Sequence, residues 1–283
     1  MKQHQQRYNV SKMAKLLGVS RSGYYAWKDR NPSNREEEDI RLRDLIKQIF
    51  EKHYGRYGSP RVWEELKRLG WLIGRKRVER LMREDRLYAR KQRKYINTTD
   101  SQHQFRVADN ILNRNFHASG AGEKWVSDIT YLRSDNGWLY LTVILDLWDR
   151  KVIGWSMDND LTAGQVCRAL EMAVLNREPK KGLIFHSDRG IQYCSDEFTR
   201  ALKRLCPSSV QSMSRKGNCW DNACAESFFK TLKVELDISK NRYSAKQIKA
   251  MVFEYIEIYY NRCRRHSAIG YAIPIALTTN SVA

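Results

Sequence analysis

The sequence lacks the features that would place the chain in a membrane or in an oxidising compartment. Its longest apolar run, LYLTVIL at residues 139–145, is far too short to span a bilayer. The opening residues MKQHQQRYNV do not form the apolar segment of a secretory signal. Six cysteines are scattered without a CxxC pair, and with six histidines they give no zinc-binding spacing. We therefore expect a cytoplasmic protein with reduced, buried cysteines and no membrane partner.

Acidic residues are scarce relative to basic ones. The 283 residues include 51 Lys and Arg against 32 Asp and Glu, which gives a formal charge of +19 and a pI near 9.7. Residues 1–99 hold 26 basic and 12 acidic residues, a net charge of +14, and the remaining 184 residues carry only +5. Such an excess repels itself unless the chain meets a polyanion. We therefore expect nucleic-acid binding, mainly by the first third.

Two short helices are expected within residues 10–30. Ser11 and Ser20 are suitable N-caps, and Gly18 ends the first helix. The residues expected on the inner faces of these helices are Met13, Ala14, Leu17, Tyr24 and Trp27. Two short helices joined by Gly-Val-Ser have the dimensions of a helix-turn-helix, which we place at residues 1–30.

A second helical region with a helix-turn-helix-like pair is expected at residues 38–95. Ser59 is the expected cap of the first helix of the pair, with Pro60 at its first position. The second helix and the arm after it are dense in positive charge. The residues that we expect to contact DNA there are Arg75, Lys76, Arg77, Arg80, Arg83, Lys91, Arg93 and Lys94. A helical hairpin that only packs is the commoner alternative, but packing does not require so many basic residues.

From Trp125 the hydrophobic period changes from helical to alternating. Three strands are expected, KWVSDITYLR, GWLYLTVILDLWD and KVIGWSM, with a hairpin turn at Asn136-Gly137 between the first two. A helix, the strand GLIFHSDRG, another helix, the strand SVQSMS and a helix from about Asn222 follow. The order β-β-β-α-β-α-β-α combines antiparallel strands with crossovers. It predicts an α/β domain built on a mixed sheet.

Three carboxylates lie where such a domain presents ligands. Asp128 is in the middle of the first strand, where an aspartate is costly to bury unless it is paired or binds a cation. Asp188 is at the carboxyl end of a later strand, and Glu226 is on the last helix. Three hard oxygen ligands suit Mg²⁺ or Mn²⁺, and two such ions would offset their charge. A role as a helix cap or in a salt bridge would account for any one of these carboxylates alone. It accounts poorly for all three in one small domain.

Five segments of the chain resemble transposases of the bacterial insertion-sequence-3 family, specifically the product of the second reading frame. They are WVSDITYL, LDLWDRKVIGWSM, HSDRGIQYCS, SMSRKGNCWDNACAESFFKTLKVEL and YNRCRRHSAIGY, and the match runs from about residue 40 to the C-terminus. The resemblance implies a core of the retroviral-integrase superfamily with a ribonuclease H-like fold, preceded by an all-α DNA-binding region. It also implies that Asp128, Asp188 and Glu226 form the catalytic, metal-binding aspartate–aspartate–glutamate triad.

One spacing departs from the family pattern. Between Asp188 and Glu226 lie 37 residues, against the usual 35 or so, and we assign the surplus to the segment LCPSSVQ at 205–211. His186 lies two residues before Asp188 in the sequence. We expect it to act at the sheet edge or in DNA contact rather than as a general base.

The implied activity is that of a DNA transposase. Such an enzyme cleaves the ends of an insertion sequence and joins the 3′-hydroxyl to target DNA by phosphoryl transfer, with two Mg²⁺ or Mn²⁺ ions per active site. The implied partners are double-stranded DNA (terminal inverted repeats and target), further copies of the chain, and the upstream reading-frame product, by fusion or complex. The implied location is the bacterial nucleoid. The residues expected to hold DNA beside the triad are Arg215, Lys216, Lys230 and Lys233.

The expected organisation places a linker at 96–119 between the helical region and the core. The core spans 120–240, and 241–283 form its C-terminal helical extension. Two alternatives stay open. A ribonuclease H-like nuclease would share the carboxylates but would not need two DNA-binding modules. A DNA-binding regulator with an inert core would share the basic first third, and it would shift DNA in a gel without cleaving it.

Overall fold

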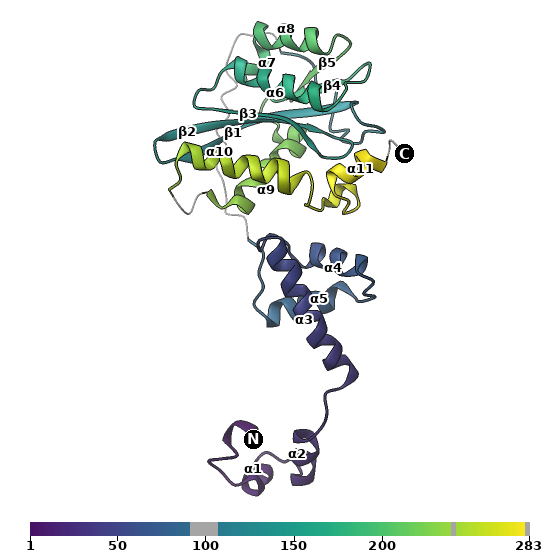
Figure 1. The fold of residues 1–283 in the computed structure, drawn as a ribbon, viewed down its shortest axis with the longest axis vertical. Helices are drawn as coiled ribbons and strands as arrows, with labels where there is room; N and C mark the ends of the chain where they lie inside the picture. Colours follow the sequence, from purple (N-terminus) through teal and green to yellow (C-terminus); the bar gives the residue numbers. More distant parts are fainter. Residues whose placement is uncertain (91–106, 239–241, 281–283) are drawn as a thin grey trace. The chain divides into compact units, whose positions relative to one another are not determined.

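The computed structural model describes residues 1–90, 107–238 and 242–280 (Figure 1). The chain divides into two compact units, Met1–Ala89 and Arg90–Ala283, and each unit has its own buried core. Within the described residues, no helix is both long enough and apolar enough to cross a membrane.

The regular elements of the first unit are all helices in its described residues. They are the 3₁₀ helix η1 (Lys2–His4), α1 (Val10–Leu16), α2 (Arg21–Lys28), α3 (Asn34–Lys52), α4 (Ser59–Arg68) and α5 (Arg75–Glu84). Ser20 caps α2 as predicted, but Asn9 rather than Ser11 caps α1. Leu17 and Trp27 are 59% and 60% exposed, so our prediction that they are buried was wrong. These helices are too short to bury more than a narrow stripe around Ala14 and Tyr24.

The helices α3, α4 and α5 form a small three-helix core. A capping box of Ser33 and Glu36 begins α3. Gly58 occupies the cap position of α4, and Ser59, which we predicted as the cap, is its first helical residue. The buried side chains between these helices include Leu42, Ile46, Val62, Leu66, Val78 and Leu81. Burial of these apolar surfaces from three separate helices stabilises the unit.

The second unit is a five-stranded mixed sheet with helices on both faces (Figure 1). Its strands are β1 (Lys124–Ser134), β2 (Gly137–Asp146), β3 (Val152–Asp158), β4 (Ile184–Ser187) and β5 (Val210–Met213), in the order β3-β2-β1-β4-β5. The strand β1 pairs antiparallel with β2 and parallel with β4. This confirms the predicted order of strands along the chain, the mixed sheet and the ribonuclease H-like core.

Helices cover the two faces of this sheet in distinct groups. On one face lie α6 (Ala163–Asn176), α7 (Ile191–Cys194) and α8 (Asp196–Leu205). On the other lie α9 (Ala223–Leu236) and α10 (Ala245–Phe253), which continues as the π-helix η4 (Glu254–Tyr260). The short elements are η2 (Cys219–Asn222), η5 (Ser267–Ile269) and α11 (Pro274–Asn280). At Gly154 the backbone of β3 passes so close to Ala169 on α6 that a Cβ atom would collide with it.

Part of the segment that we expected to be a linker packs against this core. In the described residues 107–119, Leu112 is buried and its backbone N–H donates to Ser212 Oγ at 3.0 Å. The cysteines also differ from expectation. Cys194 and Cys206 are buried, but Cys167 and Cys224 are half-buried and Cys263 is exposed, so the prediction of uniformly buried thiols was wrong.

Candidate active site

Asp128 and Asp188 are brought together by the parallel pairing of β1 with β4. The register pairs Val126 with His186, so each aspartate lies two residues beyond a paired position. Neighbouring strands are about 4.8 Å apart, which places the two backbones side by side at this end of the sheet. Asp128 Oδ1 accepts from Ile129 N–H at 2.9 Å, and Asp188 Oδ1 accepts from Gly190 N–H at 2.9 Å. Both carboxyl groups are therefore oriented by the adjoining backbone.

Glu226 is positioned by the way α9 begins. The Asn222 side chain donates through Nδ2 to the carbonyl oxygen of Ser127 at 2.9 Å, and both residues are buried. This bond fixes the start of α9 against β1 at the residue next to Asp128. Glu226 follows one helical turn later, on a helix that packs against β1.

The charges of these carboxylates affect the protonation of Asp128 and Glu226. Burial raises the pKa of Asp128 well above its ordinary value, and the charges of Asp188 and Glu226 raise it further. Burial also raises the pKa of Glu226. The charge of Lys230 lowers this pKa, and the charge of Asp188 raises it. Like charges that repel at short range produce such shifts, so the three groups share one electrostatic environment. Among the described residues, however, no three His, Cys, Asp or Glu side chains form a ready-made ligand shell.

Two lysines of α9 face this cluster. Lys233 is half-buried, and burial lowers its pKa while the charge of Asp128 raises it. Lys230 is exposed and lies close enough to Glu226 to lower the pKa of that carboxyl. The positive charges of Lys230 and Lys233 therefore lie on the side of α9 that carries Glu226.

A fourth carboxylate, Asp221, stabilises the segment that leads into α9. It is fully buried and accepts from Arg215 through the backbone N–H, Nε and Nη2, at 2.7–3.0 Å. It also accepts from Arg114 Nε and Asn110 Nδ2, both at 2.9 Å. Hydrogen bonds from Arg215 hold the pKa of Asp221 well below its usual range. Arg215, which we predicted to contact DNA, is thus bound to a carboxylate.

His186 is not a DNA contact. The side chain is fully buried, with Nδ1 2.9 Å from Ser212 Oγ and Nε2 3.2 Å from Ser214 Oγ. Burial lowers its pKa to about 4, so the ring is neutral at pH 7. It links β4 to β5 and to the loop after β5, so of the two roles that we expected, at the sheet edge or in DNA contact, its burial excludes the DNA contact.

Comparisons with known proteins place the chain in a family. It is 42% identical over 272 residues to Transposase InsF for insertion sequence IS3A of Escherichia coli (strain K12), covering 95% of this chain and 94% of that protein. The chain belongs to the InsF family of insertion-sequence transposases. It is also 42% identical over 265 residues to the Insertion element IS600 uncharacterized 31 kDa protein of Shigella sonnei, covering 93% of this chain and 96% of that one.

Parts of this InsF-family chain match domain models and solved structures. Residues 118–219 and 209–274 match integrase core domain models, and residues 36–95 match an HTH-like domain model. Among solved structures, the chain is similar to the HTLV-2 integrase catalytic core domain in complex with magnesium. The identity is 14% and the TM-score 0.43, over 56% of this chain and 97% of that one.

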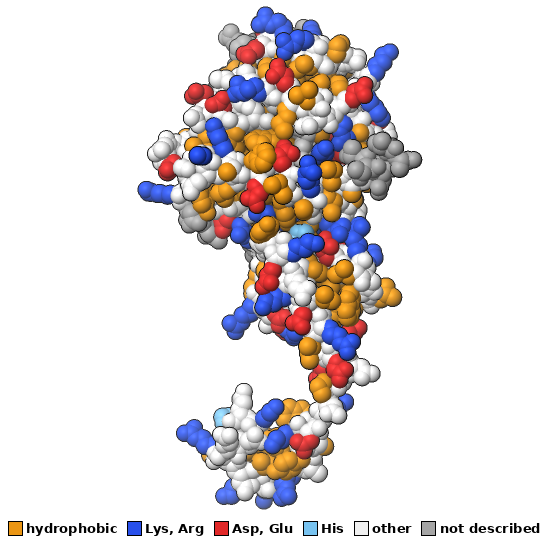
Figure 2. All heavy atoms as spheres, in the orientation of Figure 1, with side chains coloured by type: hydrophobic (Ala, Val, Ile, Leu, Met, Phe, Trp, Pro, Cys, Tyr) orange, Lys and Arg blue, Asp and Glu red, His pale blue; other side chains and the backbone are white. Residues whose placement is uncertain are grey.

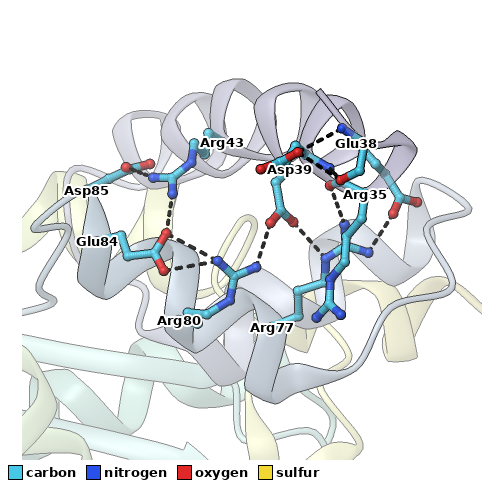
Figure 3. Close-up of polar contacts among 10 residues, drawn as sticks. Arg35, Glu38, Asp39, Arg43, Arg77, Arg80, Glu84 and Asp85 are labelled. Carbon is cyan, nitrogen blue, oxygen red and sulfur yellow. Dashed lines mark hydrogen bonds and ion pairs between the residues drawn. The ribbon is translucent and has the colours of Figure 1, made fainter. Parts of the chain in front are cut away.

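The HTH-like match of this InsF-family chain covers α3–α5, where an ion-pair network joins α3 to α5 (Figure 3). Arg77 donates to Asp39 at 2.7 Å and to Glu38 at 2.5 Å. Arg80 donates to Asp39 at 2.6 Å and to Glu84 at 3.0 Å. These two arginines, which we predicted to contact DNA, are already bound to carboxylates. Asp39 therefore competes with a DNA phosphate for both guanidinium groups.

The remaining basic residues predicted to contact DNA have different surroundings. Arg75, Lys76 and Lys216 are exposed, as is Arg83, which pairs with Glu79 at 3.5 Å on the same helix. Lys91, Arg93 and Lys94 lie outside the described residues. On the face shown in Figure 2, basic and acidic side chains intermix over α3–α5, whereas residues 1–30 carry mostly basic ones and a single acid, Asp29.

Sequence reasoning missed the residues that hold these groups in place. The contacts of Asn222, Asp221, Asn110 and Arg114 follow no local periodicity. The only available signal was an acid and an amide, Asp221 and Asn222, directly before the apolar face of a helix.

Proposed function

We propose that this chain is a DNA transposase that cleaves the ends of its insertion sequence and joins the resulting 3′-hydroxyl to target DNA. Asp128, Asp188 and Glu226 are the proposed catalytic triad. The observation that carries this proposal is that carboxylates on β1, on α9 and at the end of β4 lie close enough for Asp188 to raise the pKa of both Asp128 and Glu226, and for Glu226 to raise that of Asp128. They do so in a chain of the InsF transposase family, inside the two matches to integrase core domains.

The donor set fits a hard divalent cation. It consists of carboxylate oxygens, on three separate elements, whose mutual repulsion a cation would relieve. Asp128, Asp188 and Glu226 would hold Mg²⁺ or Mn²⁺, with two ions per active site. Bound there, such ions would offset negative charge and polarise a phosphodiester. The carboxylates match a divalent cation in donor chemistry and in charge. Among the described residues they do not form a ready-made ligand shell.

The chain's own residues bind and orient the DNA in this proposal. Lys230 and Lys233 contact phosphates of the strand that enters the site, because both lie on the helix that carries Glu226. Asn222 and Asp221 are positioning residues, since each fixes the start of that helix without reaching the carboxylates. His186 takes no part in proton transfer, because both its ring nitrogens face serine hydroxyls in the interior.

The proposed partners are the terminal inverted repeats of the element and a target duplex. The resemblance to the insertion-sequence-3 family also supports a homo-oligomer on DNA and a fusion or complex with the upstream reading-frame product. We assign DNA contacts outside the core to exposed residues and to the basic arm. These residues are Arg75, Lys76, Arg83, Lys91, Arg93 and Lys94, and Lys216 is the corresponding exposed residue of the core. Arg77, Arg80 and Arg215 instead hold carboxylates.

The decisive experiment compares the wild-type chain with Asp188→Asn on a duplex that ends in the element's own terminal repeat. With Mn²⁺, the wild type should nick and join this DNA. The variant should bind DNA as well as the wild type does. Its nicking and joining rates should each fall by on the order of 10³-fold or more, because the amide lacks the negative charge that binds the cation. Asp160→Asn, at an exposed aspartate, is the matched control and should behave as wild type. Strand-resolved gels report nicking and joining, and a gel shift reports binding.

Three outcomes would contradict the proposal. Cleavage by Asp188→Asn above trace rates would remove this residue from the site. A wild-type chain that binds the repeat but leaves it intact would be a DNA-binding regulator. A wild-type chain that cleaves without joining would be a nuclease.

A further inference from the structure

The hairpin of β1 and β2 has two unlike faces beyond Asp128. Leu132, Ser134 and Leu139 are buried on one face. At the tip, the backbone N–H of Asp135 donates to the carbonyl oxygen of Tyr243 at 2.9 Å. This face is therefore packed against the protein. Side chains of neighbouring residues in a strand point to opposite faces, so the alternate residues form a second face.

The second face carries aromatic residues where an outward strand face is usually polar. Tyr131 is paired directly with Tyr140, with ring centroids 5.2 Å apart, and the Trp138 ring lies 6.4 Å from that of Tyr131. Arg133, paired with Trp138, has its guanidinium 5.2 Å from the centre of the indole. Trp138 is 48% exposed, Arg133 is exposed, and both tyrosines are half-buried. We call Tyr131, Arg133, Trp138 and Tyr140 the aromatic ladder.

The aromatic ladder begins beside the carboxylates. Tyr131 follows Asp128 by three residues, about 10 Å along the strand, and Arg133 follows it by about 17 Å, so both side chains lie on the other face of β1 from that of Asp128. Burial raises the pKa of Tyr131, and the charges of Asp188 and Asp128 raise it further, which agrees with this proximity. The pairing of β1 with β4 ends at Val126, so a DNA strand with a phosphate at the carboxylates can pass the edge of β1 beyond Asp128 to reach the face that carries the ladder. A duplex strand rises about 3.4 Å per nucleotide and an opened strand extends further, so the ladder would meet bases within about five positions of the site.

We propose that the aromatic ladder stacks against unpaired bases of the DNA strand that enters the carboxylate site. The inference rests on the proposed function, which supplies the strand. Aromatic rings stack on any base, but the face of a base is accessible only where the duplex is opened. Arg133 adds a positive charge beside the Trp138 ring, where a neighbouring phosphate would lie. The ladder would thus hold the opened end of the element during cleavage and joining.

A purely structural role is the competing explanation. Aromatic cross-strand pairs stabilise two-stranded hairpins without any ligand. Trp138 separates the two explanations best, because its ring is half exposed and its removal leaves the Tyr131–Tyr140 pair in place. Phe253 on α10 offers a matched control, since it is 52% exposed and also makes an edge contact, with Trp155 at 6.3 Å.

The experiment uses the full chain and a photoreactive DNA. The probe is a duplex with a single-stranded oligothymidine overhang, carrying 5-iododeoxyuridine at one of the first six overhang positions. Wild type and Trp138→Phe should crosslink to this overhang within residues 131–140, as mapped by mass spectrometry. Trp138→Ala should lose this crosslink, and Phe253→Ala should retain it. On the terminal-repeat duplex, joining by Trp138→Ala should fall by about 5- to 150-fold, the range for one lost base stack.

Thermal unfolding of each variant completes the test. The proposal predicts that Trp138→Ala loses the crosslink and joining while its melting temperature stays within a few degrees of wild type. If crosslinking and joining are unchanged, or fall only as far as stability falls, the ladder is packing and the proposal is overturned. If the wild type neither cleaves nor joins DNA yet shows the Trp138-dependent crosslink, the proposed function fails and the base-stacking site stands.

Discussion

At the residue scale, the half-buried Asp128 and the fully buried Asp221 show how surroundings decide what an aspartate does. Burial and the charges of Asp188 and Glu226 raise the pKa of Asp128. Hydrogen bonds from Arg215 and Arg114 lower the pKa of Asp221. Asp221 is therefore a satisfied structural anion. Asp128 is a destabilised anion that a cation would stabilise, and such perturbed groups are concentrated at functional sites.

We expect Asp221→Asn to destabilise the second unit. The amide keeps the shape but removes the charge that Arg215 and Arg114 contact, and hydrogen bonds to charged groups contribute about 1.5–3 kcal/mol each. Because both arginines are about half exposed, we expect a loss of about 1–3 kcal/mol in the free energy of unfolding. Urea denaturation measures this, with Asp160→Asn as the control. Unchanged stability would show that the arginines contribute nothing through Asp221.

This loss should depend on pH in a definite direction. The pKa of Asp221 in the folded chain lies below its ordinary value of 3.8, so the folded state binds its proton less readily than the unfolded state. The stabilisation is therefore complete above about pH 4 and disappears as pH falls through the lower, folded-state pKa. The difference in unfolding free energy between wild type and Asp221→Asn should be constant from pH 5 to 7. Below pH 4 it should shrink, and a difference that grew there would contradict the assignment.

At the element scale, α9 is held at both ends. Asn222 ties its start to β1, and near its end Glu235 accepts from buried Arg264 at 2.7 Å and from the Tyr255 hydroxyl at 2.9 Å. The segment after residue 241 is thus bonded to the helix that carries Glu226. Because both ends are fixed, the side chains between them keep a constant orientation, as the metal-binding role proposed for Glu226 requires.

Replacing Lys230 and Lys233 together with alanine should weaken the DNA contact of this helix. The two ammonium groups lie near Glu226 and Asp128, so each is expected to contact a phosphate of the entering strand. Strand joining should decrease, and the dependence of binding on salt should fall by roughly one unit of slope per lost contact. Lys246→Ala with Lys249→Ala, an exposed pair on α10, is the matched control. Equal effects in the two double variants would show that α9 contributes only general charge.

At the scale of the whole molecule, positive charge is concentrated in the first unit. The network on α3 and α5 neutralises Arg77 and Arg80, so the free charge available to DNA comes from other residues. Residues 1–30 contribute most of it with a single opposing acid. Two compact units with separate cores allow DNA binding to be assigned to one unit and tested apart from the other.

We expect residues 1–89 alone to bind duplex DNA, with an affinity that falls steeply as salt rises, because counterion release dominates phosphate contacts. A fragment of residues 1–106 should bind more tightly and with a steeper salt slope, since it adds Lys91, Arg93 and Lys94. Fluorescence anisotropy over a salt series measures both. Arg75→Ala with Lys76→Ala should reduce the slope, whereas salt-insensitive binding would place the DNA contact elsewhere in the chain.

The sequence by itself determined the order of the strands and the elements that carry Asp128, Asp188 and Glu226. These features follow from hydrophobic period, turn residues and caps, which act between residues a few positions apart. The same patterns predicted the helix α5, which carries many of the chain's arginines. They also distinguished the helical first third from the mixed sheet that follows.

Only the tertiary structure decided what the individual polar side chains bind. Arg77 pairs with Asp39, 38 residues away, and Asn222 with Ser127, 95 residues away. It also decided which face of the β1–β2 hairpin is left uncovered, so that Trp138 is exposed while Leu139 is buried. The physical reason is that a buried polar group is stable only with a partner, and folding brings that partner from a distant part of the chain. A local pattern therefore shows that an arginine is present, but not whether it is available to DNA.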